Sequence, residues 1–211
     1  MQIQVVGTYK LTSPLRYALQ CFSKVLRERW QRKIPYEIDA LAKTVILYSD
    51  AESTGRIASV IICPTVRVCY YGTVPAKLRE LLRSRETQII AFELIAAIVA
   101  ILQVQQLGLN EVSFRHFVDS TPALSCILKA SSKQDGLNNL SGLIWFTAGK
   151  LLKDYWAQYV PSAANLADGP SRNQFSVVTQ LGIRIVRANF SACTLAAESW
   201  IASMAVEALV V

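Results

Sequence analysis

The sequence has few of the residues that build thiolate metal sites and disulfide frameworks. It contains five cysteines, no CxxC pair and a single histidine, His116. A structural zinc site needs about four clustered Cys or His ligands, and a disulfide framework needs cysteines in pairs, so this composition argues against both. A reducing compartment is therefore expected. His116 lies within a predicted strand, where a neutral imidazole with one hydrogen-bond partner is the expected state.

Long hydrophobic runs are also missing. The longest, IIAFELIAAIVAIL at 89–102, spans 14 residues and contains Glu93. An ordinary membrane span needs about 20 residues, so we expect no membrane partner. The first residues, MQIQVVGTYKLTSPLR, show no charged segment followed by an apolar one, so we expect no signal peptide. The sequence does not give the cellular address, and within a reducing compartment the cytoplasm and the nucleus both stay open.

Apolar and basic residues, by contrast, are plentiful. Hydrophobic residues make up 52% of the 211, which is ample for the core of one domain with a short extension. Lys and Arg number 22 against 15 Asp and Glu, which gives a formal charge of +7. A polyanionic partner suits this charge, and so does a solvated basic surface.

Short β-branched and aromatic runs open the main part of the chain. Those at 44–50, 56–64 and 66–74 are joined by tight Ser-Thr-Gly and Pro-Thr connections, which predicts an antiparallel meander. A long helix from about 87 to 107 follows and ends at Gly108, a common residue at a helix C-terminus.

The rest of the pattern adds parallel strands and more helices. The run at 111–119 follows a helical crossover, so we expect it to lie parallel to the first strand. Further expected elements are helices at 122–131 and 136–152, a strand at 154–161 and a last helix at 170–180. The predicted fold class is α/β, with a five-stranded mixed sheet (three antiparallel strands, then parallel additions) and helices on both faces.

The chain is expected to divide into three regions. Residues 1–41 hold an amphipathic basic helix at 13–33 and a linker near Pro35. Residues 42–180 form the main domain. Residues 181–211 are a C-terminal extension of unknown role, for which a packing helix is the default interpretation.

Two aspartates follow apolar runs at comparable positions. Asp50 ends TVILYSD before the turn sequence ESTG, and Asp119 ends FRHFVD before STP. Each has a plain structural interpretation, because Asp favours turns and helix N-caps. If the first and fourth strands are parallel neighbours, however, both carboxylates emerge at the sheet edge where open α/β folds bind ligands.

Two further acids complete a candidate site. Glu93 lies in a helix that is apolar nearly all round, where a carboxylate must reach a cation, a donor or solvent. Asp168 lies in YVPSAANLADGPSR, where Asp-Gly-Pro taken alone is an ordinary turn. Four converging carboxylates would repel one another without a divalent cation. Oxygen-only ligation favours Mg²⁺ or Mn²⁺ over zinc, and two such ions can promote phosphodiester cleavage.

Four segments occur in an order that resembles a known family. They are YSDAE, FEL of the long helix, FVDSTPAL and VPSAANLADGPSR. In sequence and in setting they resemble the ribonuclease H domains carried by reverse transcriptases of retrotransposons, over roughly residues 42–180. The resemblance implies a metal-dependent endonuclease that hydrolyses the RNA strand of RNA/DNA hybrids. By position, the catalytic ligands of two Mg²⁺ or Mn²⁺ ions are Asp50, Glu93, Asp119 and Asp168.

The resemblance also implies partners. The basic N-terminal helix resembles a connection to an upstream reverse transcriptase polymerase domain. Candidate substrate-binding residues are Ser120, Lys129 and Lys133. Contact with phosphates explains the two lysines, and a solvated helix end explains them equally well.

Two other functions stay open. The loop before Asp168 reads SAA (162–164), where many cellular ribonucleases H have a histidine. A catalytically inactive, nucleic-acid-binding or scaffold domain of the same fold is therefore the alternative. Another nuclease of this fold, such as a transposase or a 3′ to 5′ exonuclease, is a third interpretation. A fourth acid at the start of the last helix favours the ribonuclease H arrangement.

Overall fold

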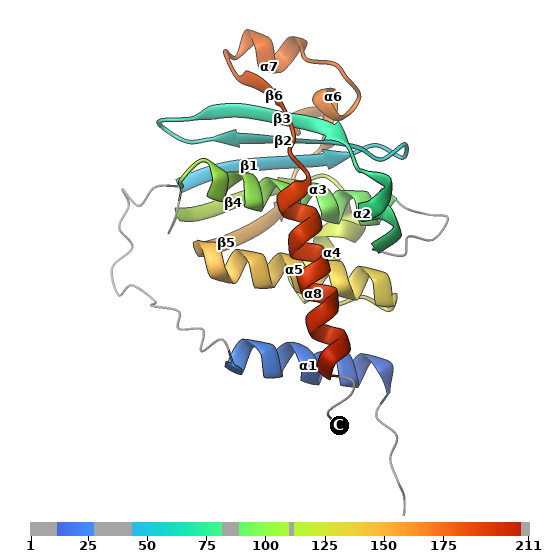
Figure 1. The fold of residues 1–211 in the computed structure, drawn as a ribbon. Helices are drawn as coiled ribbons and strands as arrows, with labels where there is room; N and C mark the ends of the chain where they lie inside the picture. Colours follow the sequence, from blue (N-terminus) through green and yellow to red (C-terminus); the bar gives the residue numbers. More distant parts are fainter. Residues whose placement is uncertain (1–11, 28–43, 82–88, 110–111, 208–211) are drawn as a thin grey trace, which may run out of the picture.

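A six-stranded sheet organises the protein in this computed structural model, which describes residues 12–27, 44–81, 89–109 and 112–207. The strand order is β5-β4-β1-β2-β3-β6 (Figure 1). The strands are β1 (Thr44–Ala51), β2 (Arg56–Ile62), β3 (Arg67–Thr73), β4 (Val112–Val118), β5 (Leu152–Tyr159) and β6 (Arg184–Arg187).

Only β2 runs against the other strands. It pairs antiparallel with β1 and β3, whereas β1 with β4, β4 with β5 and β3 with β6 are parallel. Gly55 closes the β1–β2 connection at a φ of +83°, a conformation that costs glycine little. The three-strand meander and the parallel return of β4 are confirmed, and the fold class is the predicted α/β one with a mixed sheet.

The predicted number of strands was wrong, because β6 makes a sixth. Its four residues, RIVR, pair with β3 in the register Val68↔Arg184 to Tyr71↔Arg187. Four residues are too few for a periodic pattern to stand out from the sequence. The edge of β3 supplies the hydrogen-bonding partner that makes the strand.

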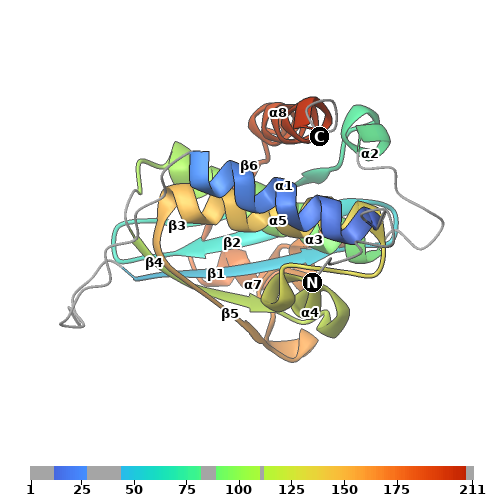
Figure 2. The same ribbon diagram turned by 90° about the horizontal axis from the view of Figure 1, so that it is seen from below.

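Helices cover both faces, as predicted. They are α1 (Ser13–Arg27), α2 (Ala76–Leu81), α3 (Ile89–Gln106), α4 (Thr121–Lys129), α5 (Asp135–Leu151), α6 (Asp168–Ser171), α7 (Ser176–Gln180) and α8 (Ser191–Glu207), with a 3₁₀ turn at Ser162–Ala164. Figure 2 shows α1, α3, α5 and α8 on one side of the sheet. On the other side α6 contacts β1, β2 and β3, and α7 packs beside it.

The single last helix expected at 170–180 was wrong, because the segment forms α6 and α7. Asn173 between them has a φ of 61°, which interrupts a right-handed helix. Residues 28–33 of the predicted first helix, and the linker at Pro35, lie outside the described residues.

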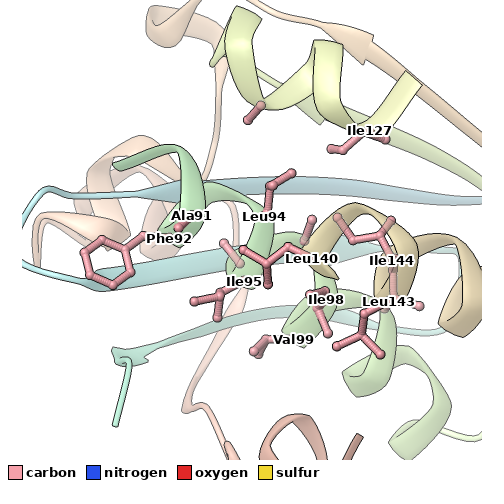
Figure 3. Packing of buried hydrophobic residues seen from close by; sticks show 14 of the residues in the cluster. Ala91, Phe92, Leu94, Ile95, Ile98, Val99, Ile127, Leu140, Leu143 and Ile144 are labelled. Atoms are coloured by element: carbon pink, nitrogen blue, oxygen red, sulfur yellow. The ribbon is translucent and has the colours of Figure 1, made fainter. Parts of the chain in front are cut away.

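Helix α3 is the centre of the largest hydrophobic cluster. Every residue from Ala91 to Val104 is buried, and Figure 3 shows its side chains packed against those of α4 and α5. Among the described helices α3 alone has the length and apolarity of a membrane span, and 78% of it is buried inside the protein. The sheet and α5 cover its apolar surface, so packing in the core explains its composition.

The C-terminal extension packs onto the helical face. Trp200 of α8 is 3% exposed and belongs to the main cluster, and the centre of its ring lies 5.1 Å from the centre of the Phe146 ring of α5. A Cβ at Gly142 of α5 would collide with Trp200 and with the Tyr17 hydroxyl of α1. The absence of a side chain there lets α1 and α8 approach α5 closely. The boundary at residue 181 stays a prediction.

Replacement of Trp200 tests whether α8 belongs to the folded core. Trp200→Ala should lower the free energy of unfolding by about 3–5 kcal/mol, because it opens a cavity. Leu195→Ala on the same helix, where the side chain is 65% exposed, should cost less than about 0.5 kcal/mol. Urea denaturation of both variants measures the difference. Equal, small losses would show that α8 contributes nothing to the core.

Candidate metal centre

Three acids from three different elements meet at one end of the central strands. Carboxylate oxygens of Asp50 (β1), Glu93 (α3) and Asp119 (directly after β4) all lie within 4.8 Å of one another. Asp50 and Glu93 are buried, and Asp119 is partly buried. The parallel pairing of β1 and β4 brings the two aspartates together, and the packing of α3 on β1 adds the glutamate.

The fourth predicted acid, Asp168, lies beside this group rather than within the set of three. Its Oδ1 accepts a hydrogen bond from Arg172 Nη2 at 2.7 Å, which is also an ion pair. Its negative charge nevertheless contributes to raising the pKa values of both Asp50 and Glu93. Asp168 opens α6, so the expectation that it stands at the start of a helix is confirmed.

A short anchored segment sets the position of Asp168. The Asn165 side chain donates to the Ser49 carbonyl at 3.1 Å and accepts from the Ala167 backbone N–H at 3.1 Å. The buried Ser171 hydroxyl then donates to Oδ2 of Asp50. The residues before α6 and the last residue of α6 are thereby tied to Ser49 and Asp50 near the end of β1.

Burial and mutual repulsion raise the pKa values of two of the acids. Desolvation raises the pKa of Asp50 to about 7, with help from the charges of Asp119 and Asp168 and against the Ser171 hydrogen bond. Desolvation likewise raises the pKa of Glu93 to about 9, and the neighbouring carboxylates add to the shift. The site is therefore short of positive charge.

Two buried carboxylate oxygens in this group lack a hydrogen-bond partner within the described residues. They are Oε2 of Glu93 and Oδ1 of Asp119. Buried polar atoms without partners are uncommon, and a hard divalent cation would satisfy both. Oxygen atoms alone make up the donor set, so these residues fit Mg²⁺ or Mn²⁺.

The plainer interpretations of the acids do not hold for two of them. Ser120, not Asp119, is the N-cap of α4, because its side chain accepts the Ala123 N–H at 3.4 Å. Glu93 is 5% exposed, so it does not reach solvent from its helix. Capping and solvent exposure therefore leave Asp119 and Glu93 unexplained.

His116 lies in the core, as expected. It is fully buried on β4, with Nε2 2.7 Å from Ser49 Oγ and Nδ1 2.7 Å from the Tyr155 hydroxyl. Burial lowers the pKa of His116 to about 3, so the imidazole stays neutral near pH 7. The chain's single histidine is thus engaged in packing the sheet.

The predicted substrate-binding residues fall in two places. Ser120 adjoins Asp119 at the site. Lys129 lies at the far end of the nine-residue helix α4, about 13 Å along its axis. Lys129 and Lys133 line a hollow of about 880 Å³, and Tyr17 and Phe22 of α1 form part of its other side. The structure does not bring the lysines to the acids.

Sequence reasoning assigned no role to three residues that shape the site. Asn165 anchors the segment to Ser49. Ser171 orients Asp50, and Arg172 pairs with Asp168. All three lie in NLADGPSR, the stretch already singled out for its acid. Polar residues within one helical turn of a candidate ligand were the available signal.

Comparison with known proteins adds likeness of structure only. No family model and no curated protein matches the chain. The N-terminal RNase H domain of Rv2228c from Mycobacterium tuberculosis is similar at a TM-score of 0.47 and 15% identity, over 67% of this chain and 99% of that domain. RNase H1 from Halobacterium salinarum is similar at a TM-score of 0.45 and 18% identity, over 62% of this chain and 98% of that chain. LC11-RNase H1, solved in complex with an RNA/DNA hybrid, is similar at a TM-score of 0.47 and 15% identity, over 64% of this chain and 98% of that chain.

The raised pKa values predict how stability depends on pH in chelator. An acid whose pKa is raised by folding stabilises the fold below its unfolded value and loses that contribution as pH rises. Folding raises the pKa of Asp50 from 3.8 to about 7 and the pKa of Glu93 from 4.5 to about 9, so each contribution is lost between those two pH values. The melting temperature should therefore fall across pH 4.5 to 9, and Glu93→Gln should flatten the decline.

Divalent cations supply the complementary measurement. Mg²⁺ or Mn²⁺ should raise the melting temperature of the wild type, because the ions bind the assembled site and hardly bind the unfolded chain. Glu93→Gln should respond much less. Glu198→Gln removes a partly exposed carboxylate that pairs with Lys77, and as the matched control it should behave as the wild type. Identical metal responses in all three proteins would contradict a metal site at Glu93.

Proposed function

We propose that the protein is a metal-dependent endonuclease that hydrolyses the RNA strand of RNA/DNA hybrids. The observation that carries this proposal is the convergence of Asp50, Glu93 and Asp119 at one end of parallel β1 and β4. Ligands in open α/β sheets bind at that edge. The preference for a hybrid is supported by the resemblance of the sequence around these acids to ribonuclease H domains.

The proposed ligands of two Mg²⁺ or Mn²⁺ ions are Asp50, Glu93, Asp119 and Asp168. Such ions, when bound, activate a water and stabilise the leaving oxygen in phosphodiester hydrolysis. The chain itself positions the ligands. Ser171 fixes the orientation of Asp50, and Arg172 holds Asp168 beside the other three acids.

Proton transfer in the proposed reaction falls to carboxylates and water. His116 is the chain's only histidine, and its two ring nitrogens are engaged with Ser49 and Tyr155 in the core. The candidate substrate contacts are Ser120 beside the acids and the two lysines at the far end of α4. A formal charge of +7 suits the polyanionic substrate.

We also propose that the domain works as part of a retroelement reverse transcriptase. The support is the sequence resemblance of FVDSTPAL and NLADGPSR to domains of that context. A polymerase domain encoded in frame upstream of this chain would strengthen the proposal, and an unrelated upstream reading frame would count against it.

Cleavage of a defined set of substrates tests the activity. With Mg²⁺ or Mn²⁺, the wild type should cut the RNA of an RNA/DNA hybrid and leave duplex DNA, duplex RNA and single strands largely intact. Asp50→Asn should lower hybrid cleavage by more than about 100-fold, since loss even of a residue that supports a metal ligand costs 10- to 100-fold. Glu198→Gln removes a distant charge and should cleave normally.

Three results would count against this function. Hybrid binding without any cleavage by the wild type would favour the inactive nucleic-acid-binding domain. Undiminished cleavage by Asp50→Asn would reject the role of the acids. Preferential cutting of DNA would instead point to another nuclease of the same fold.

A further inference from the structure

A second hollow lies beside α6 at the ends of β2, β3 and β6, and it adjoins the acids. Its volume is about 420 Å³, within the range of small-molecule sites. Six of the eleven residues that line it carry polar side chains, namely Arg56, Tyr71, Thr73, Ser171, Asn173 and Arg187. The wall formed by Ser171 is shared with the metal centre, because its hydroxyl donates to Asp50. The hollow therefore begins one side chain away from the proposed cleavage site.

Strand register places the charged residues of both sites on the same face. Paired residues in neighbouring strands point to the same side of a sheet, and side chains alternate along each strand. Asp50 pairs with Ala58, two residues from Arg56 in β2. Tyr71 of β3 pairs with both Ala58 and Arg187. Asp50 and the two arginines consequently share one face across four strands.

Arg187 carries the free positive charge of this hollow. Its side chain is exposed and has no ion pair or hydrogen bond with any described residue, whereas Arg56 forms an ion pair with Glu52. Thr73, Tyr71 and Asn173, whose side chains carry neutral hydroxyl and amide donors, line the same hollow. A guanidinium with five fixed donors, flanked by neutral donors, is suited to a phosphate group.

We propose that this hollow binds a backbone phosphate of the nucleic-acid substrate, with Arg187 as its main contact. The inference rests on the proposed function, since it takes the ligand to be a strand that also reaches the acids. It gives the C-terminal segment a role, because β6 supplies Arg187 and completes the hollow at the edge of β3. The proposed nucleic-acid contacts then run from the acids on β1, past α6, to the β6 edge of the sheet.

Binding measured without cleavage tests the phosphate site. Fluorescence anisotropy of the full chain with a labelled RNA/DNA hybrid, in chelator and over a series of salt concentrations, gives the Kd and its salt dependence. Arg187→Ala should weaken binding by about tenfold, as expected for loss of a charged hydrogen bond. It should also lower the slope of log Kd against log salt by about one. The Kd of Arg187→Lys should lie between those of the wild type and Arg187→Ala, since Lys keeps the positive charge and loses the forked set of donors.

Arg184 offers a matched control on the same strand. It carries the same charge and is exposed, but it lies three residues from Arg187 and pairs with Val68, so it belongs to the opposite face. Arg184→Ala should change Kd less than about twofold, the loss of a distant exposed charge being small. Thermal melts should show both variants folded, because neither side chain is buried.

Distinct outcomes separate this inference from the proposed function. Equal weakening by Arg184→Ala and Arg187→Ala would mean that net charge alone matters and would overturn the site, as would unchanged binding in Arg187→Ala. Cleavage by the wild type with no effect of Arg187→Ala rejects the inference and keeps the function. Binding that depends on Arg187, without cleavage in Mg²⁺ or Mn²⁺, keeps the inference and rejects the function.

Discussion

The repulsion among three carboxylates held within 4.8 Å of one another is the constraint on which the rest of this structure depends. Burial makes the arrangement unfavourable, and the packing around it must hold the acids together. Helix α3 provides much of this. Its Ala96, Ala97 and Ala100 are fully buried, and these small side chains let the helix lie close against β1 and β2. Glu93 is thereby fixed opposite Asp50 on a rigid element.

The segment after β5 adjusts the charge of the same site. Asn165 and Ser171 tie it to the end of β1, and Arg172 pairs with Asp168 at the edge. The ion pair accounts for the position of Asp168 beside the other acids, since its charge is already compensated locally. Ser171 contributes to both the metal centre and the neighbouring hollow. It orients Asp50 and forms a wall of the hollow that holds Arg187.

The C-terminal extension connects the two faces of the sheet. Strand β6 lengthens the sheet beyond β3, and the chain then passes Phe190, whose ring lies 2.9 Å from where a Cβ at Gly72 would stand. From there α8 packs against α1, α2, α3 and α5 on the helical face. One segment therefore contributes both to the hydrophobic core through Trp200 and to the proposed phosphate site through Arg187.

Local patterns in the sequence determined the elements and the local setting of each acid. Short β-branched and aromatic runs predicted β1 to β5, a long apolar run predicted α3, and the residues Ser-Thr-Gly predicted the turn at Gly55, because these features depend on neighbours a few residues apart. Tertiary structure alone decided what meets what. Ser171 and Asp50 are 121 residues apart in the sequence. Arg187 lies beside Tyr71 only because β6 pairs with the edge of β3. Such contacts are selected by burial and strand pairing across the whole chain, which leave no periodic trace in a short segment.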